Sequence, residues 1–271
     1  MKQFIVTSIL FLLMILPYNG LANERRFTYT TESSVLPAGA REIELWHTDR
    51  RGRGYLYRRI DQRVEYEFGV TDGLMSALYF NVTSRSRDNN GDTPGGSKSS
   101  STSFSISNEW KVKLTDRVAD PIGTALYGEV TIGTDKEELE AKLILDKQFR
   151  RVLLAADMVA EYESTTDVVD GASAADEEFK FKTGTGIAYL FDGGFGAGIE
   201  VRNENIFVKG ALAHSSLFAG PVLSYSTETY WATLTFLPQV RSFKGGTTAG
   251  STLDLGEFEK FQTRLLFSFH L

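Results

Sequence analysis

The chain has 271 residues, with 29 basic and 35 acidic side chains, a formal net charge of −6 and no cysteine. The lack of cysteine excludes a disulfide scaffold, a thiolate metal site and acylation of the chain as a lipoprotein. No block of basic residues of the kind that binds nucleic acid is present, so that class of function is excluded as well.

The first 22 residues have the layout of a cleavable signal peptide. Lys2 gives a basic start, an apolar stretch covers residues 4–16, and Gly20 and Ala22 occupy the −3 and −1 positions of a cleavage site. The apolar stretch is shorter than the ~20 residues that a membrane-spanning helix needs. We therefore expect the chain to be exported and cut between Ala22 and Asn23. No later apolar run is long enough for a helical membrane protein.

After a short extension, residues 23–38, the sequence alternates between apolar and polar positions with a period of two. Residues 60–70 illustrate the pattern, because the even positions are mostly apolar while the odd positions Arg63, Glu65 and Glu67 are charged. Successive side chains of a strand point to opposite faces, so each such segment has one oily and one polar side. The pattern predicts about twelve strands, at 41–49, 55–69, 74–84, 102–114, 122–133, 138–146, 151–163, 178–190, 195–204, 215–225, 230–240 and 259–271.

The lengths of the segments and of their connections favour a membrane barrel over a soluble sandwich. Most segments exceed the usual soluble strand of about 5–6 residues and suit a tilted membrane strand of about 9–11 residues or more. Short turns alternate with longer polar loops at 85–101, 164–177 and 241–257. Outer-membrane barrels combine short periplasmic turns and longer extracellular loops in this way. We expect the extension 23–38 to lie in the periplasm or to enter the lumen, and residues 39–271 to form the barrel.

Two further features support this interpretation. Aromatic residues gather near predicted strand ends, as in the girdles of membrane barrels; they are Trp46, Tyr55, Tyr57, Phe68, Tyr79, Phe80, Trp110, Tyr189, Phe191, Tyr230 and Trp231. The last segment places Leu265, Phe267, Phe269 and Leu271 on one face. This ending resembles the C-terminal signature that the barrel-assembly machinery reads, although that signature usually ends in Phe.

The sequence thus predicts an all-β, transmembrane, antiparallel up-and-down barrel in the outer membrane of a Gram-negative bacterium. Its expected partners are outer-membrane lipid, lipopolysaccharide and the assembly machinery. Tyr29-Thr30-Thr31-Glu32, Leu36-Pro37-Ala38-Gly39, the stretch 65–73 and Gly220-Pro221 also resemble a family of uncharacterised, porin-like proteobacterial outer-membrane proteins. The resemblance implies a barrel and an outer-membrane location, and it brings no activity.

The polar faces of the predicted strands are rich in charge. A charge that faces lipid costs about 2–4 kcal/mol at the midplane for Arg or Lys, so these side chains are expected to face the lumen. The candidate lumen charges are Arg59, Asp61, Arg63, Glu65, Glu67, Glu109, Lys111, Lys113, Glu129, Glu140, Lys142, Asp157, Glu161, Lys180, Lys182, Glu200, Arg202 and Arg264. They either line a pore and select solutes or pair across the lumen and close it.

The leading functional hypothesis is a small channel or transport-related protein for small polar or charged solutes. The alternative is a non-conducting structural or surface-interaction barrel that acts through its extracellular loops. A third alternative is a lipid-modifying enzyme, because His214 and Ser216 lie two residues apart in a predicted strand, as a histidine-activated hydroxyl requires. The serine is followed by Leu217-Phe218 instead of the Asn-Gly of outer-membrane phospholipases, so we predict no catalytic residue. We also predict no metal site and no cofactor.

Overall fold

The computed structural model describes residues 23–88, 98–169, 172–246 and 251–271, so the predicted signal peptide lies outside the described residues. Within these ranges, no helix is long and apolar enough to cross a membrane.

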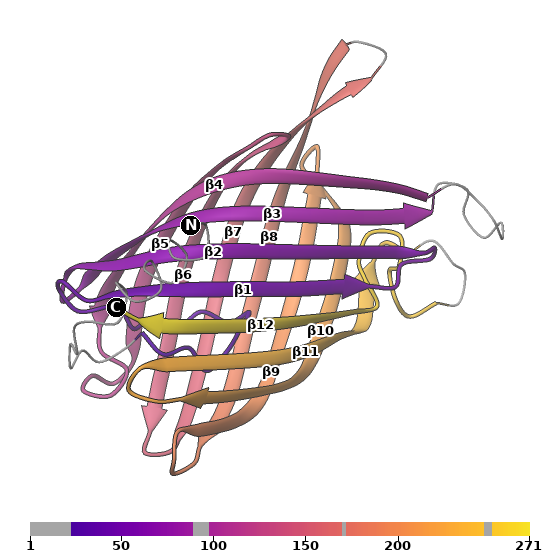
Figure 1. Ribbon diagram of the computed structural model, residues 1–271. Helices are drawn as coiled ribbons and strands as arrows, with labels where there is room; N and C mark the ends of the chain where they lie inside the picture. Colours follow the sequence, from indigo (N-terminus) through magenta and orange to yellow (C-terminus); the bar gives the residue numbers. More distant parts are fainter. Residues whose placement is uncertain (1–22, 89–97, 170–171, 247–250) are drawn as a thin grey trace, which may run out of the picture.

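Over the described residues, twelve antiparallel strands form one closed barrel (Figure 1). The strands are β1 Arg41–Arg51, β2 Tyr57–Thr71, β3 Leu74–Asp88, β4 Lys98–Thr115, β5 Gly123–Gly133, β6 Lys136–Phe149, β7 Val152–Val169, β8 Ala172–Leu190, β9 Phe195–Val208, β10 Ala211–Ser226, β11 Tyr230–Lys244 and β12 Phe261–His270. Each strand pairs with its neighbours in sequence, and β12 closes the ring against β1. The predicted up-and-down barrel of about twelve strands is confirmed.

The two ends of the barrel differ in their connections. The end that holds the turns 72–73, 150–151 and 191–194 is called the turn rim here. The first residue of β1 and the last residue of β12 both lie at this end. The opposite end, called the loop rim, holds residues 52–56 and the described parts of the connection from β11 to β12, residues 245–246 and 251–260. Strands of the near wall run across the view of Figure 1 while those of the far wall run steeply, as the tilt of a closed barrel requires.

The predicted loops 85–101 and 164–177 differ from the structure. Within 85–101, β3 continues to Asp88 and β4 begins at Lys98, so both ends of that predicted loop are strand. Residues 164–177 were expected to form a polar loop, but β7 continues to Val169 and β8 begins at Ala172. Antiparallel pairing continues from Ser164 opposite Glu177 to the tip of the hairpin. The stretch contains Thr and Val residues, which favour strands. The hairpin therefore projects beyond the barrel wall, as the top of Figure 1 shows.

The alternation in sequence sorts side chains between the outer face and the lumen. On β2, Val64 and Tyr66 are exposed on the outside, whereas Glu65 and Glu67 are buried inside. On β4, Ile106 is likewise exposed. An exposed apolar band outside and buried charge inside are the arrangement that a bilayer demands.

Four of the predicted girdle aromatics point into the barrel instead. Trp46, Tyr57, Tyr79 and Trp231 are on the inward-facing positions of their strands, and the last three are at most 8% exposed. The guanidinium of Arg63 lies 4.9 Å from the Trp46 ring and 4.3 Å from the Tyr79 ring. The Trp46 and Tyr79 rings therefore serve as contact faces for the Arg63 cation inside the barrel, which the position of an aromatic near a strand end does not reveal.

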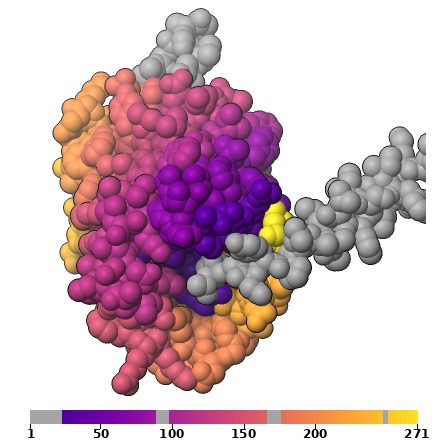
Figure 2. Space-filling view, turned by 90° about the vertical axis from the view of Figure 1, so that its left-hand side faces the viewer, coloured from indigo at the N-terminus to yellow at the C-terminus, as the bar shows by residue number. Residues whose placement is uncertain are grey.

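Residues 23–40 are called the N-terminal segment here. Residues 23–36 lie inside the barrel lumen, and residues 37–40 cross the turn rim, where Ala38 bonds to Asp72, and lead into β1. Phe27 is fully buried in a cluster with Leu153, Ala155, Ala188 and Val222 of the wall. A side chain at Gly186 of β8 would meet the Phe27 ring at 2.5 Å, so this close contact requires glycine. Figure 2 looks at the end where β1 begins, and indigo residues are visible between the magenta and orange walls. The sequence allowed this extension to lie either in the periplasm or in the lumen, and in the structure it enters the lumen.

Phe27→Ala tests how firmly the segment is packed. Loss of the buried ring leaves a cavity, so we expect the free energy of unfolding to fall by about 3–5 kcal/mol. The measurement is urea unfolding of the protein in lipid vesicles. Phe80→Ala on the outer face, where the ring is 51% exposed, is the matched control and should cost less. Equal losses in the two variants would contradict the packing described here.

Candidate functional site

A cavity of about 290 Å³ lies inside the barrel, bounded by the N-terminal segment and by the inward faces of β1 to β9 and β12. Of the eighteen predicted lumen charges, sixteen line it: Arg59, Asp61, Arg63, Glu65, Glu67, Glu109, Lys111, Glu129, Glu140, Lys142, Asp157, Glu161, Lys180, Lys182, Arg202 and Arg264. The other two lie elsewhere. Glu200 is buried beneath the N-terminal segment, and Lys113 lies beside Asp116 of a turn, with 3.6 Å between their charged atoms.

Arginines dominate the wall near β1 and β2. Arg50 and Arg59 both donate to Asp61, at 2.8 and 2.7 Å. Arg63 contacts Glu65 at 3.3 Å and reaches Glu129 on β5 at 3.6 Å. Among the ion pairs between described strand residues, the Arg63–Glu129 pair is the exception that links strands which are not neighbours. Apart from this pair, the ion pairs between described strand residues lie within one strand or between neighbouring strands, so the charges pair mainly along the wall.

Lysine and glutamate alternate on the opposite wall, over β6 to β8. Lys180 lies 3.0 Å from Glu161, and Lys182 also pairs with Glu161. Lys142 lies 2.8 Å from Glu140, and Lys136 contacts the neighbouring Glu138 at 2.6 Å. Both signs of charge therefore face the cavity in nearly balanced numbers.

Three carboxylates of the wall hold the backbone of the N-terminal segment. Glu200 on β9 accepts hydrogen bonds from the amides of Thr28, Tyr29 and Thr30 at 2.8–3.2 Å. Asp157 on β7 accepts one from Thr31 at 2.7 Å. Hydrogen bonds to an ionised acceptor are stronger than neutral ones. They satisfy backbone groups that would otherwise be buried without partners in an irregular segment.

Asp146 on β6 continues this series, because it accepts the Ser33 amide at 2.9 Å. Farther toward the middle of the lumen, the Arg264 guanidinium lies 3.9 Å from the centre of the Tyr29 ring and donates to the Thr28 carbonyl at 3.1 Å. The segment is thus held by the wall on both sides. The alternation in sequence predicts that Asp157, Glu200 and Arg264 face the lumen. It does not reveal that they bind the segment, because residues 23–38 carry no periodic pattern that places them.

The loop between β11 and β12 also folds inward, at the loop rim. Asp254 is fully buried and accepts a hydrogen-bonding contact of 2.6 Å from the His214 ring. Gln239 of β11 bonds the backbone amide of Asp254 at 2.8 Å, and Phe258 packs edge-on against Phe218. Burial raises the pKa of Glu257 in the same loop. Asp254 is the partner of His214 that the sequence did not reveal, because the two lie 40 residues apart.

The suspected pairing of His214 with Ser216 is not formed. The Ser216 hydroxyl is buried and has no hydrogen-bond partner among the described residues. The His214 ring nitrogen Nδ1 faces Asp254 in the loop. A hydroxyl nucleophile needs its base within hydrogen-bonding reach, and this arrangement does not provide it.

A family model matches residues 19–271, nearly the whole chain. The chain belongs to a family of unknown function, DUF6662. No curated protein matches the sequence. The family membership agrees with the sequence resemblance to uncharacterised outer-membrane barrels.

Several solved barrels are similar in fold. The COG4313 outer membrane channel from Pseudomonas putida F1 matches with a TM-score of 0.63 at 10% identity, over 90% of this chain and 100% of that one. The NanC porin matches with 0.51 at 11% identity, over 84% and 100%. The KdgM porin matches with 0.50 at 10% identity, over 84% and 98%. At these identities the likeness establishes the fold, which is that of outer-membrane channels and porins.

Glu200→Gln tests the anchoring of the segment. The amide side chain keeps the shape but loses the negative charge that three backbone amides share, so we expect hydrogen exchange at Thr28 to Thr30 to accelerate roughly tenfold or more. Exchange is read by mass spectrometry on the protein in detergent. In the control Glu204→Gln, the altered residue pairs with Arg202 at 3.1 Å, and exchange in the segment should be unchanged. Slow exchange in both variants would argue against this role of Glu200.

Proposed function

We propose that the chain is a small outer-membrane channel that passes small polar or charged solutes. The observation that carries the proposal is the charged cavity, lined by acidic and basic side chains of ten strands and by the N-terminal segment. Such a surface interacts favourably with water and ions, whereas a barrel without a solvated lumen can be filled with apolar side chains. The fold shared with outer-membrane channels and porins supports the same conclusion.

The dimensions of the cavity limit the solute. A volume of about 290 Å³ corresponds to roughly ten water molecules at ~30 Å³ each. Solutes of this path are therefore small. Because charges of both signs are paired along the walls, we propose weak ion selectivity, with a local arginine-rich zone formed by Arg50, Arg59 and Arg63.

The N-terminal segment sets the conductance in this proposal. It runs through the lumen beside the cavity, and its backbone is bonded to Glu200, Asp157 and Asp146 on three strands. Ions must pass beside it, so the intact chain conducts weakly. Under this proposal the signal peptide directs export, the turn rim faces the periplasm, and the β7–β8 hairpin projects outward from the cell.

A second candidate is a non-conducting barrel that presents its outer hairpins to a surface partner. The loop that contains Asp254 and Phe258 favours this second candidate. The loop folds inward at the loop rim and thereby narrows the lumen at that end. The two candidates differ in whether current flows.

Planar-bilayer recording separates them. The chain that starts at residue 23 should give small discrete steps, and removal of residues 23–38 should increase the step several-fold because the segment no longer occupies the lumen. Folding of each form is checked by heat-dependent gel mobility. Silence of both forms, when both are folded, would refute the channel and leave the surface-interaction barrel.

Ion selectivity gives a second test. Arg59→Gln removes one of the two cations that bind Asp61, so the local potential becomes more negative and the reversal potential in a KCl gradient should shift toward cation preference. Arg151→Gln is the control, since Arg151 lies in a turn and is paired with Asp192 at 2.6 Å on the exposed turn rim. An equal shift in both variants would mean that Arg59 does not face the ion path.

A further inference from the structure

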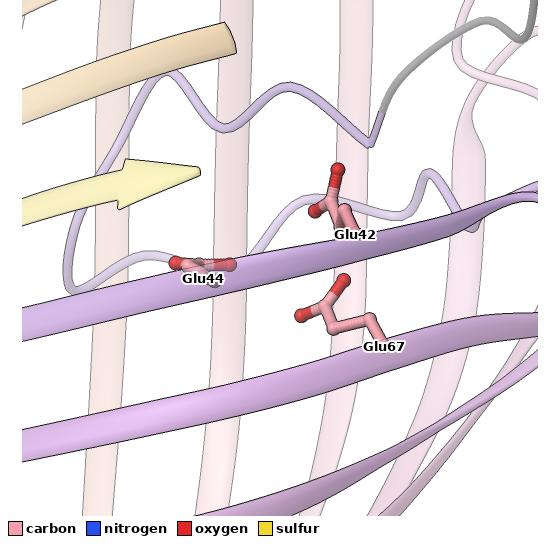
Figure 3. Close-up of side chains that lie close together, drawn as sticks. All are labelled: Glu42, Glu44 and Glu67. Atoms are coloured by element: carbon pink, nitrogen blue, oxygen red, sulfur yellow. The ribbon is translucent and has the colours of Figure 1, made fainter. Parts of the chain in front are cut away.

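Three glutamates meet inside the barrel where β1 and β2 approach the turn rim. Glu42 of β1 is the direct cross-strand partner of Glu67 on β2, and Glu44 is the next inward position of β1. One carboxylate oxygen from each of the three lies within 4.8 Å of the others. Figure 3 shows Glu42 and Glu67 facing each other across the two strands, with Glu44 farther along β1. Like charges that are directly opposite on neighbouring strands repel, so this arrangement requires either a counter-charge or a proton held between the carboxylates.

The carboxylates are buried and lack hydrogen bonds. Glu42 and Glu44 have no exposed surface, and none of their four oxygens is within well-formed hydrogen-bond geometry of another described residue. The Trp231 indole N–H and the Glu67 carboxyl group lie near Glu42, but neither completes such a bond. Two long ionic contacts are present, 3.8 Å from Arg25 to Glu44 and 3.5 Å from His270 to Glu42. Buried carboxylates are ordinarily both paired and hydrogen-bonded, so neither contact is sufficient for this pair.

A separate polar atom points to a ligand at the same place. Ser268 on β12 is the cross-strand partner of Glu44 on the inward face. Its side chain is completely buried, and its hydroxyl oxygen has no partner among the described residues. A neutral oxygen therefore lies next to the carboxylates with its hydrogen-bonding capacity unused.

A second acidic triad in the same lumen differs from this one in having lysine partners. Glu138, Glu140 and Glu161 also bring three oxygens within 4.8 Å of one another. Each of them has a lysine, with contacts of 2.6 Å for Glu138, 2.8 Å for Glu140 and 3.0 Å for Glu161. That triad is neutralised by the protein, whereas no lysine forms an ion pair with Glu42, Glu44 or Glu67 in the described part of the chain.

We propose that Glu42, Glu44 and Glu67 bind one divalent cation, Ca²⁺. When all three carboxylates are ionised they carry three negative charges, and Arg25 offsets one of them. With His270 neutral, two charges remain for the ion to neutralise. One oxygen of each carboxylate is already close to the other two, and carboxylate oxygens, in monodentate or bidentate form, are the ligands that Ca²⁺ accepts. Mg²⁺ usually keeps several waters and demands a stricter octahedron, which a fully buried cluster of this kind does not favour.

The ion would also fix the start of the N-terminal segment. Asn23 donates to Glu67 at 3.5 Å, and Arg25 reaches Glu44. Both residues belong to the segment that occupies the lumen. Binding is thus independent of whether the barrel conducts, and it couples the anchoring of the segment to the concentration of the cation.

The test compares thermal unfolding in EDTA with unfolding in CaCl₂, using protein refolded in detergent free of lipopolysaccharide. Ca²⁺ is added before refolding as well as after it, because the site is buried. At a hundredfold excess over Kd, we expect the unfolding midpoint to rise by about 5–10 °C. Tb³⁺ in place of Ca²⁺ should give luminescence sensitised by tryptophan, because Trp231 is the cross-strand neighbour of Ser268.

The variants Glu42→Gln and Glu44→Gln should each lose the Ca²⁺-dependent rise and the Tb³⁺ signal. In EDTA they should unfold at a higher temperature than the parent chain, since one repelling charge is gone. Glu140→Gln in the lysine-neutralised triad is the matched control and should keep the response to both metals. Each variant is examined by its unfolding midpoint and by Tb³⁺ luminescence. The comparison with the parent chain can therefore still be made if the folding yield of a variant is low.

Cleavage before Asn23 would create an α-amino group that competes as a counter-charge, so the chain is prepared both with Asn23 as its first residue and with two glycines before it. We expect a Ca²⁺ response in both forms, and a larger one in the extended form. No shift of the midpoint and no luminescence in either form of the parent chain would overturn it, as would an undiminished response in Glu42→Gln.

Discussion

The exclusion of charge from lipid is the constraint on which the rest of this structure depends. A strand that crosses a bilayer has one face in hydrocarbon, so its ionised side chains must share the other face. Here that face is the inside of a twelve-stranded ring. Dozens of charged and polar groups are thereby confined to a narrow space, and each needs a partner. Ion pairs along the wall, such as Arg59 with Asp61, meet part of this requirement.

The N-terminal segment meets another part. An irregular backbone cannot be left in a lumen without partners for its amides, and the wall carboxylates Glu200, Asp157 and Asp146 cannot be left without donors. The two requirements satisfy each other, because the segment supplies N–H groups and the wall supplies the oxygens. The buried Phe27 ring adds apolar contact at a glycine of β8. The segment is therefore as much a part of the core as any strand.

Much of the barrel could be predicted from sequence because alternation is a local property. The pattern around Arg63 and Glu65 indicates which side chains face inward before any contact is known. The same rule applied to β1 places Glu42, Glu44 and Trp46 inside, yet a tryptophan near a strand end resembles a girdle residue. The ring lies beside Arg25 and Arg63, a preference that local sequence does not contain. The pairing of His214 with Asp254 was also beyond reach, since it depends on how a loop folds back over the rim.

The long hairpin of β7 and β8 leaves part of a strand edge without a neighbouring strand. Pairing of β8 with β9 ends at Glu178 opposite Val208, so residues 172–177 pair only with β7. Their outward backbone groups form an open strand edge, which is a template for the addition of another strand. The described residues at the base of this edge, Asp176, Glu177 and Glu178, are all acidic. Two copies of the edge would repel each other, whereas a strand rich in lysine or arginine would be attracted to it.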